Sequence, residues 1–325
     1  MLLNIKSNFI LKAVFQNLNK KKKMKIIHHS KTLQNRIGYS IKDYEDYNLI
    51  KFEIIPIEGI HQKEIFINYK KCSDISFVKF NGDEIKTKKN YITPFDGVQK
   101  IFVSIKSVNF NCEKLFSDCS AIKQINIIKF ERDDIQNMNH MFSGCKKLKV
   151  INFNRFNTNK VLNMGYMFKG CEYLESLDLS EFNTTNVINM ECMFYDCINL
   201  KSINISTFNT GKVTNMESMF SYCKNISKLF LGNFISNKVT SVSNMFYDCK
   251  KLVDLDMRNF SITPEMKSKG IFNLCFSLAS LKIKNLKIAT DTSFNEIFYL
   301  CNDDLHIFSR GKKYSKEDFI KNQEK

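Results

Sequence analysis

The chain has 325 residues, 43% of them hydrophobic, and a formal net charge of +16. This length allows a sizeable core in one or two domains. The excess charge is concentrated at the N-terminal end, where residues 1–36 hold nine Lys or Arg and no acidic residue. Lys6 and Lys12 interrupt the apolar stretch of this segment, so we expect neither a signal peptide nor a membrane-spanning helix there.

Residues 1–47 are predicted to form a basic, disordered arm and linker. A basic arm can contact anionic lipid or nucleic acid. We favour a solvated arm whose contact with a membrane is weak. Nucleic-acid binding is disfavoured because the rest of the chain is close to charge-balanced.

Residues 48–110 contain several short apolar runs that are rich in Ile, Phe and Val. The stretch Asn81-Gly82-Asp83 between two of these runs is a turn signal. The pattern predicts a small β-rich domain, or an N-terminal cap that shields the open edge of whatever follows.

From residue 111 to residue 301 the sequence repeats every 26 residues without an insertion or deletion. A Phe-x-x-Cys motif marks each unit. The repeat cysteines are Cys119, Cys145, Cys171, Cys197, Cys223, Cys249, Cys275 and Cys301. A fixed period of this length indicates stacked units, each of which buries its apolar face only against its neighbours.

Each unit combines two hydrophobic periods. Leu177 and Leu179 alternate with polar residues, which is typical of a short strand with one buried face. Met190, Met193 and Phe194 are spaced as on one face of a helix. We therefore predict an α/β repeat solenoid of about eight 26-residue units, each made of a strand, a turn and a short helical return.

The pattern C-x2-L-x2-L-x-L-x2-F-N-T…V-x2-M-x2-M-F-x2-C resembles the BspA-like leucine-rich repeat surface proteins, in the variety with Met-Phe-x-x-Cys repeats. The resemblance covers residues 112–301 and implies a right-handed leucine-rich repeat coil with a binding role. It implies no catalytic residue, because the motif is structural. Pro264 and Glu265 depart from the pattern, and residues 302–325 are expected to form a C-terminal cap and polar tail.

The repeat cysteines are predicted to be reduced thiols in the core, where Met and Cys fill an irregular interior. Equivalent residues in stacked coils lie about 4.8 Å apart with parallel side chains, a geometry that suits disulfides poorly. Cys192 lies outside the apolar face, so we expect it to be exposed. Single cysteines per coil do not form a metal cluster, and the sequence holds no phosphate-binding or catalytic motif. We expect no metal, no cofactor and no enzymatic activity.

The strand positions between the core residues should form one extended face, and repeat solenoids bind through such faces. Most of these residues are small and polar. Phe230 is a large apolar residue at a position predicted to be exposed, where it is either an interface anchor or a cover for a neighbour. The candidate ligand-binding residues are Asn152, Asp178, Asn204, Phe230, Asp256 and Arg258.

Two functions fit the sequence. The first, implied by the family resemblance, is surface adhesion or the recognition of a protein or glycan ligand on the concave strand face of a surface or secreted protein. The alternative is an intracellular protein–protein interaction scaffold, possible in the cytoplasm. The missing signal peptide and anchor and the unpaired cysteines favour this alternative.

Overall fold

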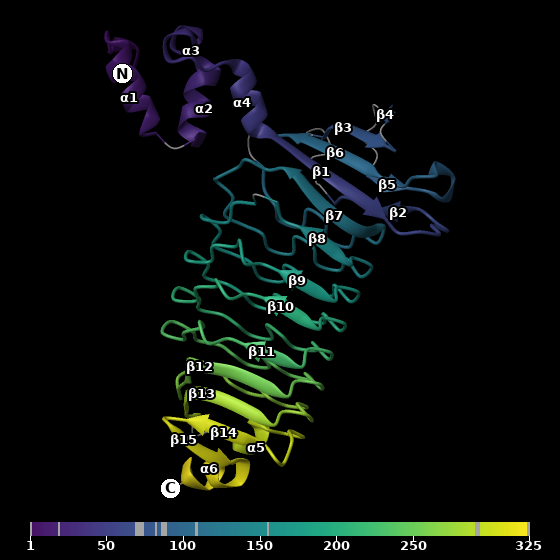
Figure 1. The fold of residues 1–325 in the computed structure, drawn as a ribbon, viewed down its shortest axis with the longest axis vertical. Helices are drawn as coiled ribbons and strands as arrows, with labels where there is room; N and C mark the ends of the chain where they lie inside the picture. Colours follow the sequence, from purple (N-terminus) through teal and green to yellow (C-terminus); the bar gives the residue numbers. More distant parts are fainter. Residues whose placement is uncertain are drawn as a thin grey trace.

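The computed structural model describes residues 2–18, 20–68, 75–81, 83–85, 90–107, 110–154, 156–289 and 293–323. In chain order they form a helical unit, a β-sheet and an elongated solenoid (Figure 1). One hydrophobic core runs from the sheet through the solenoid, and a second, separate core lies inside the helical unit.

The helical unit replaces the disordered arm that the sequence suggested. It consists of a 3₁₀ turn η1 (Leu2–Asn4) and the helices α1 (Asn8–Gln16), α2 (Lys20–His29), α3 (Lys31–Ile37) and α4 (Ile41–Asn48). Ser7 caps α1 and Ser30 caps α3, while Gly38 ends α3 with a φ of 78°. Leu11 and Phe15 lie one helical turn apart, and both belong to the small core. In the sequence, the many lysines among the apolar residues obscure this helical spacing.

The β-sheet that follows is built around β1. Its strands are β1 (Leu49–Pro56), β3 (Ile75–Phe80), β4 (Asp83–Ile85), β6 (Ile101–Lys106) and β7 (Ile122–Lys129), and a separate pair is formed by β2 (Glu64–Ile65) and β5 (Tyr91–Ile92). β1 pairs antiparallel with both β6 and β7. Since β7 belongs to the first coil of the solenoid, this pairing covers the first edge of the coil stack.

The solenoid strands stack in parallel, one per coil. They are β8 (Val150–Asn152), β9 (Ser176–Asp178), β10 (Ser202–Asn204), β11 (Lys228–Phe230), β12 (Asp254–Ile262), β13 (Ser280–Leu286) and β14 (His306–Ser309). The register keeps residues 26 positions apart side by side, as in the pair Leu177 and Ile203. The molecule is thus a β-solenoid of about 7 turns. Its last coil carries α5 (Phe294–Ile297), the antiparallel strand β15 (Lys312–Ser315) and α6 (Lys316–Gln323).

The predicted helical return is wrong: this half of the unit consists of successive turns. Tyr195 N–H bonds back to Cys192 O at 3.1 Å, as in a turn, whereas Phe194 N–H bonds to Met219 O of the next coil at 2.9 Å. Cys192 and Asp196 have φ values of 51° and 59°, which interrupt helical winding every four residues. A turn that recurs every four residues reproduces the apolar spacing of a helix, so periodicity alone could not separate the two.

A column of stacked phenylalanine rings fills the centre of the solenoid. Its members are Phe116, Phe142, Phe168, Phe194, Phe220, Phe246, Phe272 and Phe298. Neighbouring ring centroids are 5.2 to 5.8 Å apart, and the ring planes lie within 19° of one another. The rings therefore pack against each other along the whole stack. Leu174, Leu177 and Leu179 are buried as well, which confirms the predicted inward positions.

The repeat cysteines form a second column beside the rings. All ten described cysteines are unpaired and buried, which confirms the prediction for the repeat cysteines, and Cys72 lies outside the described residues. In six coils the thiol donates to the carbonyl of the preceding coil's phenylalanine, at 2.8 to 3.3 Å. Burial raises the pKa of Cys197 to about 12, so this thiol keeps the proton that it donates. Each of these six cysteines thus links two coils.

Cys192 is a correction to the sequence reading. We expected an exposed thiol, but only 9% of the residue is accessible. Its positive φ turns the side chain away from the direction that a helix would give it. Burial is the main reason that the pKa of Cys192 is raised to about 11.

We expect a thiol reagent to label few cysteines in the native protein and all eleven after denaturation. The described thiols are inside a packed interior, and their raised pKa values keep them in the unreactive protonated form. Mass spectrometry of the labelled protein gives the count. Rapid labelling of most thiols under native conditions, or a set of disulfides, would contradict the buried column.

We also expect alkaline pH to destabilise the fold through the same thiols. The pKa of Cys145 and of Cys197 is raised to about 12 in the folded chain, against about 8.5 for an unfolded chain. The unfolded state therefore loses protons first, so the stabilisation is complete below about pH 8.5 and is lost as the pH rises toward 12. Urea unfolding across this range should show a steeper loss of stability for the wild type than for Cys197→Ser. Parallel curves for the two proteins would contradict the assignment.

Candidate ligand-binding face

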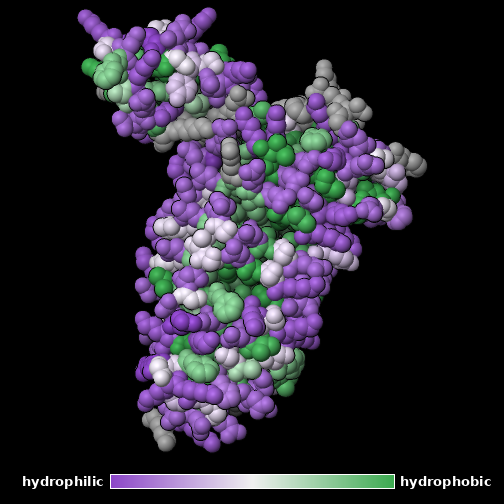
Figure 2. Space-filling model, viewed as in Figure 1, coloured by the Kyte–Doolittle hydropathy of each residue, from purple (hydrophilic) through white to green (hydrophobic). Residues whose placement is uncertain are grey.

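The strands carry one continuous column of outward positions, which we call the central column. It comprises Asn126, Asn152, Asp178, Asn204, Phe230, Asp256, Lys282 and Phe308. The strand registers pair Asp178 with Asn204 and Phe230 with Asp256, and paired strands are about 4.8 Å apart. Five of the six predicted site residues lie on this column, and Arg258 follows two positions after one of them. In Figure 2, apolar residues come to the surface along the middle of the solenoid, between hydrophilic margins.

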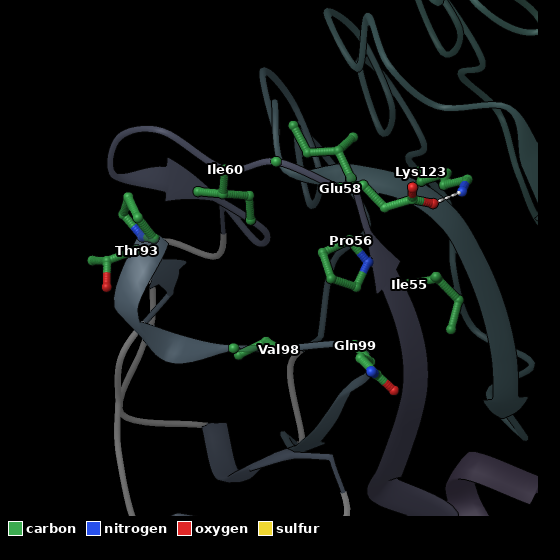
Figure 3. A pocket seen from close by; sticks show the side chains of 12 residues that line it. Ile55, Pro56, Glu58, Ile60, Thr93, Val98, Gln99 and Lys123 are labelled. Carbon is green, nitrogen blue, oxygen red and sulfur yellow. Dashed lines mark hydrogen bonds and ion pairs between the residues drawn. The ribbon is translucent and has the colours of Figure 1, made fainter.

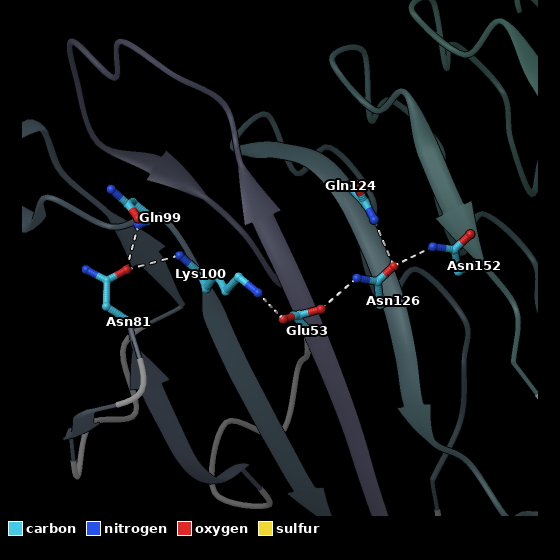
Figure 4. A network of polar contacts seen from close by, with 7 residues as sticks. All are labelled: Glu53, Asn81, Gln99, Lys100, Gln124, Asn126 and Asn152. Carbon is cyan, nitrogen blue, oxygen red and sulfur yellow. Dashed lines mark hydrogen bonds and ion pairs between the residues drawn. The ribbon is translucent and has the colours of Figure 1, made fainter.

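The N-terminal end of the central column is tied to the preceding sheet by a polar network (Figure 4). Asn152 Nδ2 donates to Asn126 Oδ1 at 2.6 Å, and Asn126 Nδ2 donates to Glu53 Oε2 at 2.7 Å. Glu53 also receives the Lys100 ammonium at 3.0 Å. The bond from Asn126 is the main reason that the pKa of Glu53 lies below its usual range. Sequence reasoning missed this network, because it depends on the antiparallel pairing of β1 with β7.

The part of the face that precedes Phe230 is polar. Asp178 and Asn204 are exposed, and each side chain forms a hydrogen bond with the residue two positions later in the chain. Asp178 Oδ1 accepts the Ser180 N–H at 2.9 Å, and this bond is the first cause of the lowered pKa of Asp178. Asn204 Oδ1 accepts the Ser206 hydroxyl at 2.8 Å. These groups stay accessible to a ligand while their conformations are already fixed, which lowers the entropy cost of binding.

Phe230 stands out from this surface. It ends β11, and 62% of the residue is exposed. Its chain neighbours Leu229 and Leu231 are buried, so the strand holds the ring outward by alternation. The structure thus places Phe230 at the surface.

Asp256 is a correction to the predicted face. We expected an accessible carboxylate, but the residue is only 5% exposed. The long side chain of Arg258, two positions later on the same outward side, lies over it and forms an ion pair with it. This guanidinium is the main reason that the pKa of Asp256 is lowered. Arg258 remains exposed, so this part of the face presents a cation to a ligand.

Beyond Asp256 the face becomes a basic groove with a volume of about 690 Å³. Its polar lining consists of six cationic side chains, and within the described part of the chain no carboxylate lines it. The lining residues are Arg258, Lys282, Ile283, Lys284, Phe308, Arg310, Gly311, Lys312 and Lys313. From the sequence, the last five of these residues were predicted to belong to the C-terminal cap and polar tail. Counting onward from Cys301 at the repeat offsets would have placed Phe308 and Arg310 on the outward positions.

A second cavity lies in the N-terminal sheet (Figure 3). It has a volume of about 550 Å³ and is lined by residues such as Pro56, Ile60 and Val98. At its rim Glu58 pairs with Lys123 at 2.6 Å, and the bond from this ammonium is the main reason that the pKa of Glu58 is lowered. An ionised, paired carboxylate is poorly suited to general acid catalysis.

The repeated coils, the parallel strands that pair from coil to coil and the extended outward face define the class of this protein. It is a repeat β-solenoid. Two overlapping segments, residues 110–228 and 196–306, match the model of a family described as Mycoplasma protein of unknown function, DUF285. These segments span more than half of the chain, which therefore belongs to the DUF285 family. A comparison with curated proteins gave no match. Within the described residues, every helix is too short or too polar to cross a membrane.

Proposed function

We propose that the solenoid is a non-enzymatic binding module, a leucine-rich repeat coil of the BspA-like kind that recognises a protein or glycan ligand on its strand face. The observation that carries this proposal is Phe230, a large apolar ring that is 62% exposed in the middle of the central column, whose other members are polar except for Phe308 at the C-terminal end. Exposed aromatic residues at the centre of a surface are frequent anchors of interfaces.

The surroundings of Phe230 suit a bound ligand. Toward the N-terminal side the face offers fixed polar groups at Asp178 and Asn204. Toward the C-terminal side it leads to the basic groove, whose cations favour anionic groups on the ligand. A ligand that lies along the solenoid axis would contact polar groups, an apolar anchor and cations in that order.

Phe230→Ala is expected to weaken ligand binding by about tenfold or more, because a buried aromatic anchor contributes about 2 kcal/mol or more to an interface. Asn204→Ala on the neighbouring strand should change the affinity much less. The measurement needs a partner, which a pull-down with the full chain can supply, and a titration of each variant against it.

The thermal stability of both variants serves as the control. Phe230 is exposed, so its removal should leave the melting temperature nearly unchanged. If Phe230→Ala unfolds the protein and the remaining folded fraction binds normally, the ring is a structural cover. If both variants bind as the wild type does, the face around Phe230 is not the binding site.

A second candidate function is an intracellular protein-interaction scaffold. It is favoured by the ten described cysteines, all of which are free thiols, since secreted proteins more often oxidise theirs. Localisation of a tagged chain separates the two proposals. Surface exposure supports adhesion or recognition, whereas retention inside the cell supports the scaffold.

A further inference from the structure

Helix α1 is apolar on two sides, and only one of them is covered. Successive helical residues are about 100° apart, so Leu11 and Phe15 share the side that is buried in the helical unit. Phe9, Ile10 and Val14 lie around the other side, with 83%, 53% and 39% of each residue exposed. We call these three residues the outer face of α1. Isolated exposed apolar residues are common, but a cluster on one short helix indicates an interaction surface.

Cationic residues lie at both ends of α1 and within it. Lys6 and Lys12 are exposed just before and within α1. Arg36 binds the start of the helix, where its guanidinium donates to Asn8 Oδ1 at 2.8 Å, and Lys23 caps the end by donating to Gln16 O at 2.8 Å. The helical unit, residues 2–48, holds ten Lys or Arg and three acidic residues, all three of them in α4. Figure 2 shows apolar residues at the surface of this unit among hydrophilic ones.

We propose that the outer face of α1 docks on an anionic lipid surface. The helix has nine residues, which is too few to cross a bilayer but enough to lie in its interface. Phe9 and Ile10 would enter the boundary between headgroups and acyl chains, while the surrounding cations would contact anionic headgroups. Charge complementarity favours this occupant, because the helical unit carries more cationic than acidic residues.

This docking is independent of the strand face. The helical unit has its own core, and α4 leads from it into β1 at the start of the sheet (Figure 1). The lipid would therefore be bound by one part of the chain and the ligand of the solenoid by another. A failure of one proposal does not affect the other.

The test is sedimentation of the full chain with vesicles. We expect binding to phosphatidylcholine vesicles that contain phosphatidylglycerol, and not to vesicles of phosphatidylcholine alone. Raising the salt from about 0.1 M to about 1 M should release the protein, because the Debye length falls from about 10 Å to about 3 Å. Equal binding to both kinds of vesicle, or no binding to either, would overturn the proposal.

A double variant identifies the surface. Phe9→Ser with Ile10→Ser should weaken vesicle binding by at least about tenfold, because both side chains lose their apolar burial in the interface. Phe230→Ser, which changes an exposed phenylalanine in the solenoid, should bind vesicles as the wild type does. Circular dichroism checks that the helices persist in the double variant. Undiminished binding by the double variant, or a loss with Phe230→Ser, would place the contact elsewhere. Absence of vesicle binding, together with binding to polyglutamate that the double variant loses, would assign the outer face to an acidic protein.

Discussion

Phe194→Ala is expected to lower the free energy of unfolding by about 3–5 kcal/mol, the range for emptying a packed aromatic site. The ring is fully buried and stacks on Phe168 at 5.7 Å and on Phe220 at 5.2 Å. Its removal leaves a cavity between two rings that the rigid coil spacing prevents from closing. Urea unfolding followed by circular dichroism gives the difference in free energy.

Phe230→Ala is the matched control, because it makes the same substitution at an exposed position of the same solenoid. We expect a change below about 0.5 kcal/mol, as for an ordinary surface residue. Comparable losses in the two variants would contradict the division into inward and outward positions. A broad, non-cooperative transition in Phe194→Ala would instead show that the stack separates into independently unfolding segments.

Arg132→Leu is expected to destabilise the protein by about 3–5 kcal/mol, because it removes one partner of a buried ion pair. Arg132 is 1% exposed and forms two bonds with the Asp134 carboxylate, at 2.8 and 2.9 Å. It also donates to Ser107 O, just after β6, at 2.7 Å and to Asn48 Oδ1, at the end of α4, at 3.3 Å. One guanidinium therefore connects the helical unit, the sheet and the first coil.

The double variant Arg132→Leu with Asp134→Leu tests this explanation. Replacing a buried pair by apolar residues costs less than breaking it, since no charge is left without a partner. We expect the double variant to recover a large part of the stability that Arg132→Leu loses. If the second substitution adds a further loss of similar size, the cost comes from the bonds to Ser107 and Asn48 and not from the stranded carboxylate.

The solenoid could be predicted from the sequence because its main signal is a constant spacing between equivalent residues. A spacing of 26 positions separates each repeat cysteine from the next, and the buried positions around Leu177 follow from that register. The helical return could not be excluded in the same way. Its turns depend on left-handed residues such as His140, Tyr166 and Cys192, which are not the glycines that normally announce a positive φ.

The order of the residues along the candidate face could be predicted from the sequence, but the contacts of their side chains could not. The period places Asp178, Asn204 and Phe230 on one column, and the structure shows them there. It does not reveal that Arg258 covers Asp256, because the conformation of a long side chain is not periodic. The link from Asn126 to Glu53 joins residues 73 positions apart, and only the pairing of the strands brings them together.

The two ends of the coil stack bear on how such a chain can change in length. The parallel strands stop at an antiparallel strand on each side, β1 against β7 and β15 against β14. A duplicated or deleted unit of 26 residues between these strands would leave both antiparallel end strands in place. It would also keep the parallel strands paired in the same register. Each added unit would extend the outward face by about 4.8 Å. The length of the outward face can therefore change in equal steps while the strands that close both ends stay the same.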